Sequence, residues 1–381
     1  MDADQNTIPP DSFVTCSGDD TVRLWNYGDT NSLPDFGGLR KNPFSKELMK
    51  IVYVDSNYGN LCDIESLANA GIGVETMSAL GAGAAPGSSF VSIGSVSGSS
   101  SVASTPSTAT APPLPPDNRG VRCVTVSPDC KHLCCGSRSG KINVYDMSNF
   151  EVLVQVVAHD GEILALEYTR NMDGPILLAS GGRDRAVHVI NADEDYKIHQ
   201  TFENDHSSSV TALKFASRLP IPGTGNGSDS QMLLMSCSAD KSILIRSADV
   251  TVQDNGHMDV GQFALANNVG NKATLYDMEI EPQQRFLLVA CHDRFIRLIN
   301  IATGKLRGKY RGSQADDGNL VRFCLDPTGS LIAAACSDKT VSIINFHTGE
   351  LLATVSGHSE QITGVKFLPD LKRFVTVSAD R

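Results

Sequence analysis

A short motif built around an aspartate recurs along the 381-residue chain and constrains its fold more than any other feature. Each copy is a β-rich run, one or two small residues, Asp, two further residues and then alternating apolar residues. The full copies are CSGDDTVRLWN (16–26), GGRDRAVHVIN (181–191), CSADKSILIR (237–246), CHDRFIRLIN (291–300) and CSDKTVSIIN (336–345). A sixth copy, GSRSGKINVYD (136–146), has Ser139 in place of the aspartate, and a seventh includes Asp380. Such internal similarity indicates a repeat architecture.

The spacing of the motif identifies the repeating unit. From Ser139 onward, successive key positions are 45, 56, 53, 45 and 42 residues apart. A period in the low forties, lengthened by loop insertions, matches WD-type propeller blades of four strands and ~40–45 residues. Period-two alternation, as in INVYD and VRLWN, indicates strands. We therefore predict an all-β WD-repeat β-propeller, present as an incomplete segment of one ring or of tandem rings.

The repeat also divides the chain into blades. We letter the four strands of a blade A to D in chain order. Residues 1–55 are predicted to be a partial blade with strands B to D, 119–357 to be five whole blades, and 358–381 to be a partial last blade with strands A and B. The two partial blades both contain a strand B, so they do not make one shared blade that closes a ring. We therefore expect the chain to be a segment of a longer protein.

Residues 76–118 differ in composition from the blades. Between Ser78 and Pro116, 32 of 39 residues are Ala, Gly, Ser, Pro or Thr. A segment of this kind cannot bury enough apolar surface to order itself, and we predict a disordered insertion between blades. Because Pro106 follows Thr105, Thr105 is a candidate site for a proline-directed kinase.

The histidines and aspartates of the repeat have a structural interpretation. Three histidines precede strand A of their blades, and each is expected to hydrogen-bond to the motif aspartate of the same blade. A His–Asp pair also suggests acid–base catalysis, but a pair that recurs in several blades is better explained as a device that holds blades together. Trp25 is the single tryptophan of the chain, and the other copies of the motif have other residues at the equivalent position. The predicted structural positions are Asp19, Trp25, His159, Asp184, His206, Asp240, Asp293, Asp338, His358 and Asp380.

No motif for catalysis or for a cofactor occurs in the chain. It has no G-x-S-x-G, no G-x-x-x-x-G-K-[ST] and no His/Cys cluster with metal-ligand spacing, and we predict a protein without enzymatic activity, metal or cofactor. The ten cysteines are expected to be free thiols in a reducing compartment, since several occupy small apolar positions of the motif. The alternative, an enzymatic propeller, would need converging carboxylates with a metal or a nucleophile with its base.

Charge and hydropathy bear on location and partners. The net charge is −11 and no block of Lys or Arg occurs, which argues against nucleic acid as the main partner. No apolar run approaches the ~18 residues that span a bilayer, and the N-terminus does not have the pattern of a secretory signal. We predict a cytoplasmic protein with protein partners and no membrane association.

Several segments resemble the mitogen-activated protein kinase-binding protein family of WD-repeat scaffolds, which includes a spindle-pole paralogue. The most specific segments are VVAHDGEILALEYTR (156–170) and RGSQADDGNLVRFCLDPTG (311–329), and the resemblance covers residues 13–55 and 119–381. It implies tandem propellers, with this chain from the second ring, partners from kinase pathways or centrosomes, and a location at the cytoskeleton, spindle pole or centrosome. In the family, kinase-docking and self-association segments follow the propellers, so we do not expect them in this chain.

Together these observations predict a non-enzymatic scaffold in MAP kinase (Jun N-terminal kinase) signalling or in spindle-pole or centrosome organisation. Propellers bind through the turns of their faces and around their central channel. The candidate partner-binding residues are Arg138, Arg183, Arg185 and Arg294, whose guanidinium groups suit acidic or phosphorylated peptides. The alternative is a propeller subunit of an RNA-processing or ribosome-assembly particle, against which the acidic charge counts.

Overall fold

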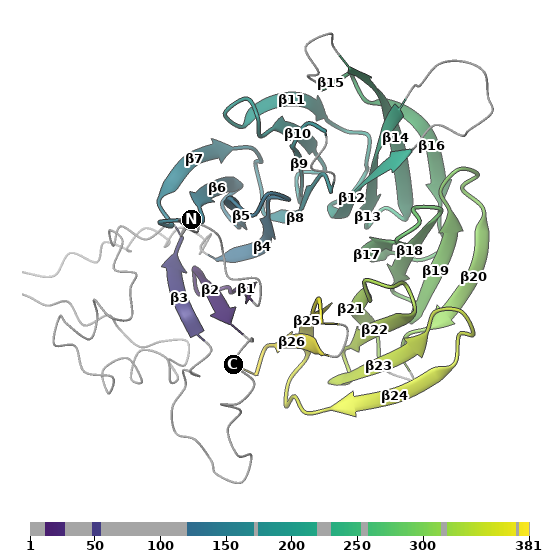
Figure 1. The fold of residues 1–381 in the computed structure, drawn as a ribbon. Helices are drawn as coiled ribbons and strands as arrows, with labels where there is room; N and C mark the ends of the chain where they lie inside the picture. Colours follow the sequence, from purple (N-terminus) through teal and green to yellow (C-terminus); the bar gives the residue numbers. More distant parts are fainter. Residues whose placement is uncertain are drawn as a thin grey trace, which may run out of the picture.

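The computed structural model describes residues 12–26, 48–54, 120–170, 174–218, 230–252, 258–313, 318–370 and 373–380. The regular elements in these ranges are β-strands, and they form seven antiparallel sheets around a common centre (Figure 1). The prediction of an all-β propeller is confirmed. In the same ranges, no helix is present that has the length and apolar character to cross a membrane.

We number the sheets as blades 1 to 7 in chain order. Blade 2 contains β4 (Val121–Val126), β5 (His132–Ser137), β6 (Lys141–Asp146) and β7 (Val152–Val157). Blade 3 contains β8 (Ile163–Tyr168), β9 (Leu177–Gly182), β10 (Val187–Asn191) and β11 (Lys197–Phe202). Blade 5 contains β17 (Leu275–Ile280), β18 (Phe286–Cys291), β19 (Phe295–Asn300) and β20 (Leu306–Arg311), and blade 6 contains β21 (Leu320–Leu325), β22 (Leu331–Cys336), β23 (Thr340–Asn345) and β24 (Leu351–Ser356). In each, the strands pair in chain order, and the first strand faces the centre (Figure 1).

Blade 4 has five strands: β12 (Val210–Arg218), β13 (Ser230–Ser238), β14 (Ser242–Val252), β15 (Met258–Val260) and β16 (Ala264–Gly270). β14 has 11 residues, about twice the length of the other third strands. Its first half pairs with β16 and its last three residues pair with β15. The extra length extends this blade outward from the ring (Figure 1).

Blades 1 and 7 have fewer strands among the described residues. Blade 1 contains β1 (Ser12–Cys16), β2 (Thr21–Asn26) and β3 (Leu48–Tyr53), and blade 7 contains β25 (Ile362–Phe367) and β26 (Phe374–Ser378). The predicted insertion at 76–118 lies outside the described residues.

The core consists of six apolar clusters, one between each pair of consecutive blades. β18 shows how one strand serves two clusters: Leu287 and Val289 pack toward blade 4, whereas Leu288 and Ala290 pack toward blade 6. Successive side chains of a strand point to opposite faces of the sheet, and both faces of a blade are covered here. This explains why the second strands are continuous apolar runs.

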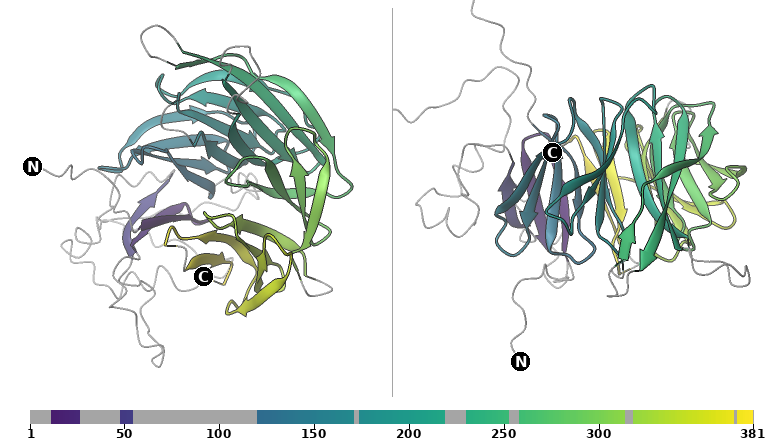
Figure 2. Two further views of the ribbon diagram at one scale, coloured as in Figure 1. Left: turned by 45° about the vertical axis from the view of Figure 1, so that its right-hand side comes forward. Right: turned by 90° about the horizontal axis from the view of Figure 1, so that it is seen from above.

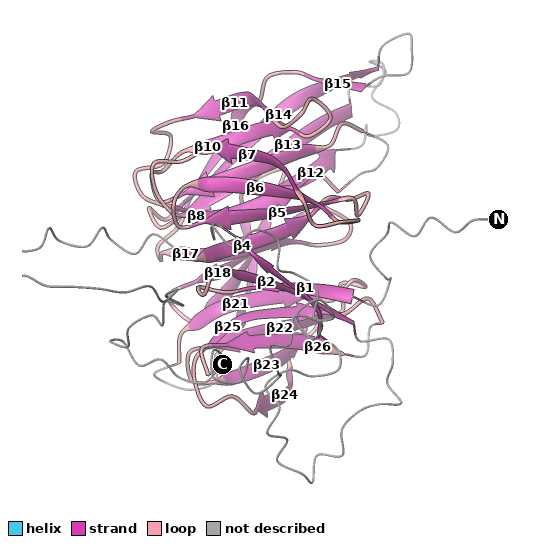
Figure 3. Cartoon of the chain, turned by 90° about the vertical axis from the view of Figure 1, so that its left-hand side faces the viewer, coloured by secondary structure: helices cyan, strands magenta, loops and turns pink. Residues whose placement is uncertain are grey.

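Seen from the side, the strands cross the thickness of the disc and the turns lie on its two faces (Figures 2 and 3). One face carries the turns between second and third strands together with the segments that lead into first strands, and we call it the B–C face. The other face carries the A–B and C–D turns. This division follows from antiparallel pairing within each blade.

Candidate functional site

The motif aspartates form the B–C turns. Oδ1 of Asp240 accepts a hydrogen bond from the Ser242 N–H at 2.9 Å, and Asp338 accepts one from the Thr340 N–H at 3.1 Å. Burial alone would raise the pKa of Asp240, but its hydrogen bonds with Ser242 and Ser207 and the nearby His206 lower the pKa below its usual value. The carboxylates are therefore charged groups that the fold uses internally.

Each of the three predicted histidines lies against the aspartate of its own blade. The Nδ1–Oδ distances are 2.9 Å for His159–Asp184, 3.1 Å for His206–Asp240 and 3.0 Å for His358–Asp380. The other ring nitrogen, Nε2, lies 3.0 Å from Ser180 Oγ, 2.8 Å from Ser236 Oγ and 2.8 Å from Thr376 Oγ1 respectively. Burial lowers the pKa of His159 and His206, so the neutral imidazole donates to the carboxylate and accepts from the hydroxyl.

A hydroxyl, an imidazole and a carboxylate in line also form the catalytic triad of serine hydrolases. In this chain Ser180 and Ser236 are completely buried, so their hydroxyls are not accessible to a substrate. The arrangement also occurs in three blades. It therefore holds the segment before the first strand onto the B–C turn.

Blades without this histidine hold the turn in other ways. Asp293 pairs with Arg297 of β19, Asp19 lies 3.0 Å from Nη2 of Arg23, and Asp338 accepts a hydrogen bond from Ser313 Oγ at 3.5 Å. In blade 2, Ser139 Oγ lies 2.8 Å from Ser137 Oγ.

At the tryptophan position of the motif, two blades have a side chain that donates a hydrogen bond to a hydroxyl of strand B. Trp25 donates from Nε1 to Thr15 Oγ1 at 2.9 Å. At the corresponding position of β14, Arg246 donates from Nη1 to Ser236 Oγ at 3.0 Å and pairs with Asp205 at 2.7 Å. Arg246 is 1% exposed, and its guanidinium lies over the Phe202 ring, 4.2 Å from the ring centroid. This arginine therefore replaces the indole N–H and adds an ion pair and a cation–π contact.

A lysine or an arginine directly follows the motif aspartate in four consecutive blades. Arg185, Lys241, Arg294 and Lys339 occupy equivalent turn positions, with φ angles of 73°, 72°, 69° and 68°. L-residues with side chains adopt this left-handed conformation at a cost of about 1–2 kcal/mol. We call these four residues the cation arc. It lies on the B–C face. The motif aspartates there form hydrogen bonds within their own turns, whereas the four cationic side chains are exposed or half-buried.

Two of the predicted binding arginines converge on one carboxylate. Arg138 Nε lies 3.6 Å from Glu162 Oε1, and Arg183 Nη1 lies 3.4 Å from Glu162 Oε2. Arg122 joins them, with Nη2 at 3.7 Å from Oε2. We call Arg122, Arg138, Arg183 and Glu162 the arginine cluster. Sequence reasoning did not identify Arg122 or Glu162.

The other two predicted arginines belong to the cation arc. Arg185 is exposed two residues after Arg183, and Arg294 lies in the corresponding turn of blade 5. The structure thus divides the four predicted residues between two surfaces of the B–C face. Thr105, the predicted phosphorylation site, lies outside the described residues.

A second group of charged side chains lies on the first strands and on the turn after one of them, on the side of the blades that faces the centre of the ring. Glu279 of β17 is 8% exposed and is contacted by Lys366 at 2.8 Å, Arg170 at 3.3 Å and Lys214 at 3.4 Å. Burial alone would raise the pKa of Glu279, but these cations hold it far below its usual value. Because these residues come from four blades, the group ties the inner strands together.

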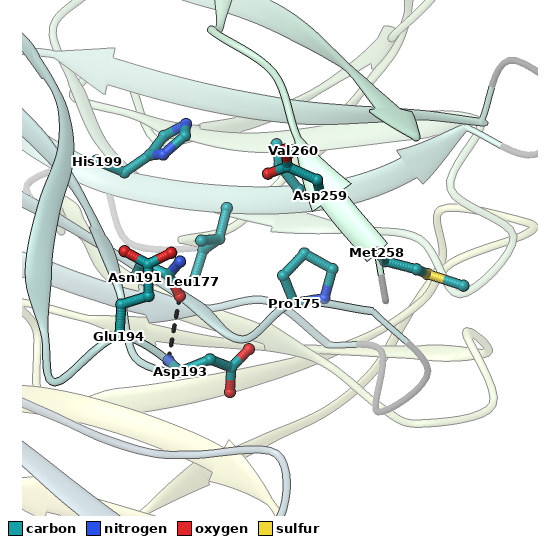
Figure 4. Close-up of a pocket in the computed structure, with 9 residues that line it drawn as sticks. All are labelled: Pro175, Leu177, Asn191, Asp193, Glu194, His199, Met258, Asp259 and Val260. Atoms are coloured by element: carbon teal, nitrogen blue, oxygen red, sulfur yellow. Dashed lines mark hydrogen bonds between the residues drawn. The ribbon is translucent and has the colours of Figure 1, made fainter. Parts of the chain in front are cut away.

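A small pocket between blades 3 and 4 is shown in Figure 4. Its lining includes Asp193, Glu194, His199 and Asp259, and its volume is about 90 Å³. Sites for organic ligands enclose roughly 300–1,000 Å³, so this pocket does not suit one. Among the described residues, no group of three His, Cys, Asp or Glu side chains is arranged to hold a metal ion.

The cysteines of the described ranges are free thiols. Burial raises the pKa of Cys237, Cys324 and Cys336 to about 12, so these thiols stay protonated and unreactive at neutral pH. Cys130 is exposed.

Comparison with known proteins places the chain among close relatives. It is 41% identical over 380 residues to mitogen-activated protein kinase-binding protein 1 of Homo sapiens, a match that covers 100% of this chain and 21% of that protein. It is 39% identical over 374 residues to WD repeat-containing protein 62 of Mus musculus, covering 98% of this chain and 21% of that protein. The chain thus spans about a fifth of the length of these relatives. Residues 99–381 match the family model of the MABP1/WDR62 second WD40 domain, and the chain belongs to this family.

Proposed function

We propose that this chain is a non-enzymatic protein-interaction platform in MAP kinase signalling or in spindle-pole or centrosome organisation, and that it acts in the cytoplasm. The observation that carries the proposal is the cation arc on the B–C face. The name of one relative states that it binds a mitogen-activated protein kinase. The free thiols support a reducing compartment.

The arc favours a protein over a nucleic acid as partner. Each of its cations follows a motif aspartate, so positive and negative groups alternate around the face. The phosphate backbone of a nucleic acid would be repelled by those carboxylates and by the overall charge of −11. Separate acidic side chains on a folded partner can pair with the cations one by one.

The test is affinity purification of the 381-residue chain and of a variant in which all four residues of the arc are replaced by asparagine. Asparagine removes the charge and tolerates the left-handed conformation, so the variant should fold. The matched control replaces Lys131, Lys305, Arg285 and Lys197, which belong to turns or strand ends of the opposite face, by asparagine.

We expect the unaltered chain and the control to recover the same kinase-pathway or centrosomal proteins, and the arc variant to lose them. Recovery of RNA-processing particles, abolished by nuclease treatment, would support the alternative instead. Equal recovery by the arc variant and the control would show that this face does not bind.

A further inference from the structure

We propose that the arginine cluster is a recognition site for a phosphorylated serine or threonine in a partner protein. This inference rests on the proposed function, because it assigns a ligand to one part of the proposed binding face. It depends on Arg122, Arg138, Arg183 and Glu162, and none of these residues belongs to the cation arc.

The cluster brings three cations to one anion. All three guanidinium groups lie within 3.4–3.7 Å of the Glu162 carboxylate, so they also lie close to one another. Three positive charges and one negative charge leave an excess of two. A phosphoserine or phosphothreonine carries about −1.5 to −2 at neutral pH, which matches this excess.

The glutamate does not satisfy the arginines. Close hydrogen bonds between a guanidinium and a carboxylate have N···O distances of about 2.7–2.9 Å, and the three distances here are all longer. Within the described residues, Nε of Arg138 is a buried donor without a hydrogen-bond partner. A phosphate at the position of the carboxylate offers three acceptor oxygens, and the glutamate, which is 20% exposed in its side chain, can turn toward solvent.

The backbone fixes the arginines in place. Arg138 N–H donates to Gly120 C=O at 2.9 Å, and Arg183 N–H donates to Glu162 C=O at 2.8 Å. These are equivalent positions of neighbouring blades. The same position holds other residues in the later blades, namely Ala239, His292, Ser337 and Ala379.

Arg122 reaches the cluster from a β-bulge. The register of β4 against β5 shifts between Val121 and Cys123, so Arg122 is the extra residue. A bulge changes the direction of a side chain, and this one is a regular feature of blades 2 to 7. The equivalent bulges of blades 3 to 7 contain Leu164, Thr211, Tyr276, Val321 and Thr363. The three arginines therefore meet because blades 2 and 3 have arginine at regular positions of the repeat that hold other residues in the later blades.

The test measures binding of the 381-residue chain to a fluorescein-labelled degenerate peptide pool with one fixed phosphoserine, by fluorescence anisotropy. The same pool with unmodified serine is the reference. We expect the phosphorylated pool to bind at least about tenfold more tightly, and Arg183→Ala and Arg122→Ala each to weaken its binding about tenfold. Lys305→Ala, which removes an equal charge from the opposite face, should leave it unchanged.

Glu162→Gln separates a binding role from a structural one. If the carboxylate occupies the site of the phosphate, its removal should tighten binding of the phosphorylated pool several-fold, even if the variant melts at a lower temperature. If the cluster only holds blades 2 and 3 together, this variant should bind no better than the unaltered chain.

The proposal is overturned if both pools bind equally, if neither binds, or if the arginine variants bind as well as the control. Binding to vesicles of phosphatidylcholine with 5% phosphatidylinositol bisphosphate in the absence of phosphopeptide binding would also overturn it, and would point to a lipid headgroup. Retention of partners through the cation arc, with no phosphopeptide binding, would remove this inference and leave the proposed function intact.

Discussion

Lys366 of β25 donates a hydrogen bond of 2.8 Å to Glu279 of β17, although β21 lies between these two strands in the ring. The contact joins blades 5 and 7 directly through the central channel. It adds a link between blades that do not share an apolar cluster.

Glu279→Gln should therefore destabilise the fold. The substitution removes the charge that three cations share, and we expect the free energy of unfolding to fall by about 1–3 kcal/mol, less than for a fully buried pair because the Lys366 side chain is 69% exposed. Urea unfolding monitored by circular dichroism measures the change. Because these cations hold the pKa of Glu279 below its usual value, the charge is present throughout the neutral range and the effect should not vary between pH 6 and pH 8.

His188 should make stability depend on pH. Burial, aided by the nearby His159, lowers the pKa of His188 to about 4, against about 6.5 in an unfolded chain. The unfolded state therefore takes up a proton first as the pH falls. This contribution to stability is complete above about pH 6.5 and is lost between pH 6.5 and pH 4, by up to about 3 kcal/mol.

His188→Leu tests this assignment, because Leu244 occupies the equivalent position of blade 4. Urea midpoints at pH 7.5 and pH 5 should differ less in this variant than in the unaltered chain. A pH dependence that the substitution leaves intact would rule out His188 as its source.

Lys241→Asn should stabilise the chain. Lys241 has a φ of 72°, and asparagine tolerates this conformation better than lysine does. We expect a gain of about 0.5–1 kcal/mol, visible as a rise in the midpoint of thermal unfolding. Lys305→Asn, outside the left-handed region, is the comparison and should give no such gain.

Arg246→Met should be among the most destabilising single changes. It leaves Asp205 and the Ser236 hydroxyl without the guanidinium and empties the space over Phe202, and we expect a loss of about 2–4 kcal/mol. Arg246→Trp should lose less, since an indole N–H can bond to Ser236 as Trp25 bonds to Thr15. Equal losses in the two variants would mean that the hydrogen bond to Ser236 does not matter.

Cys130 should be the most reactive thiol of blade 2. It is exposed, whereas Cys123 is half-buried, Cys134 and Cys135 are completely buried, and burial raises the pKa of all three. Treatment of the folded chain with a maleimide, followed by mass spectrometry, should find Cys130 modified and its two neighbours unmodified until the chain is unfolded. Rapid modification of Cys134 would show that blade 2 opens in solution.

The repeat made much of the fold predictable. A motif that returns every 42 to 56 residues gives the blade, the strand order and the partner of each histidine, because the same contacts recur at each copy. The features that differ between blades were not predictable in this way. The 11-residue β14 depends on pairing with two outer strands, and the residues of those strands follow no repeat.

The arginine cluster shows the same limit. Arg138 and Arg183 stand out in the sequence because they belong to the motif. Arg122 and Glu162 are 40 residues apart and outside it. The bulge that carries Arg122 recurs in blades 2 to 7, but the residue in it differs from blade to blade, and the packing of blade 2 on blade 3 that brings Arg122 to Glu162 has no signal in a single sequence.

The six apolar clusters each join two consecutive blades, and this has a consequence for how the chain folds. Apart from the charged group around Glu279, which links blades that are not adjacent, the coupling is then between nearest neighbours, as in a one-dimensional Ising chain. Folding can nucleate at any one interface and spread in both directions along the chain, one blade at a time. A defect in a second strand such as β18 weakens two couplings at once and interrupts that propagation, whereas a defect in an outer strand leaves the path open.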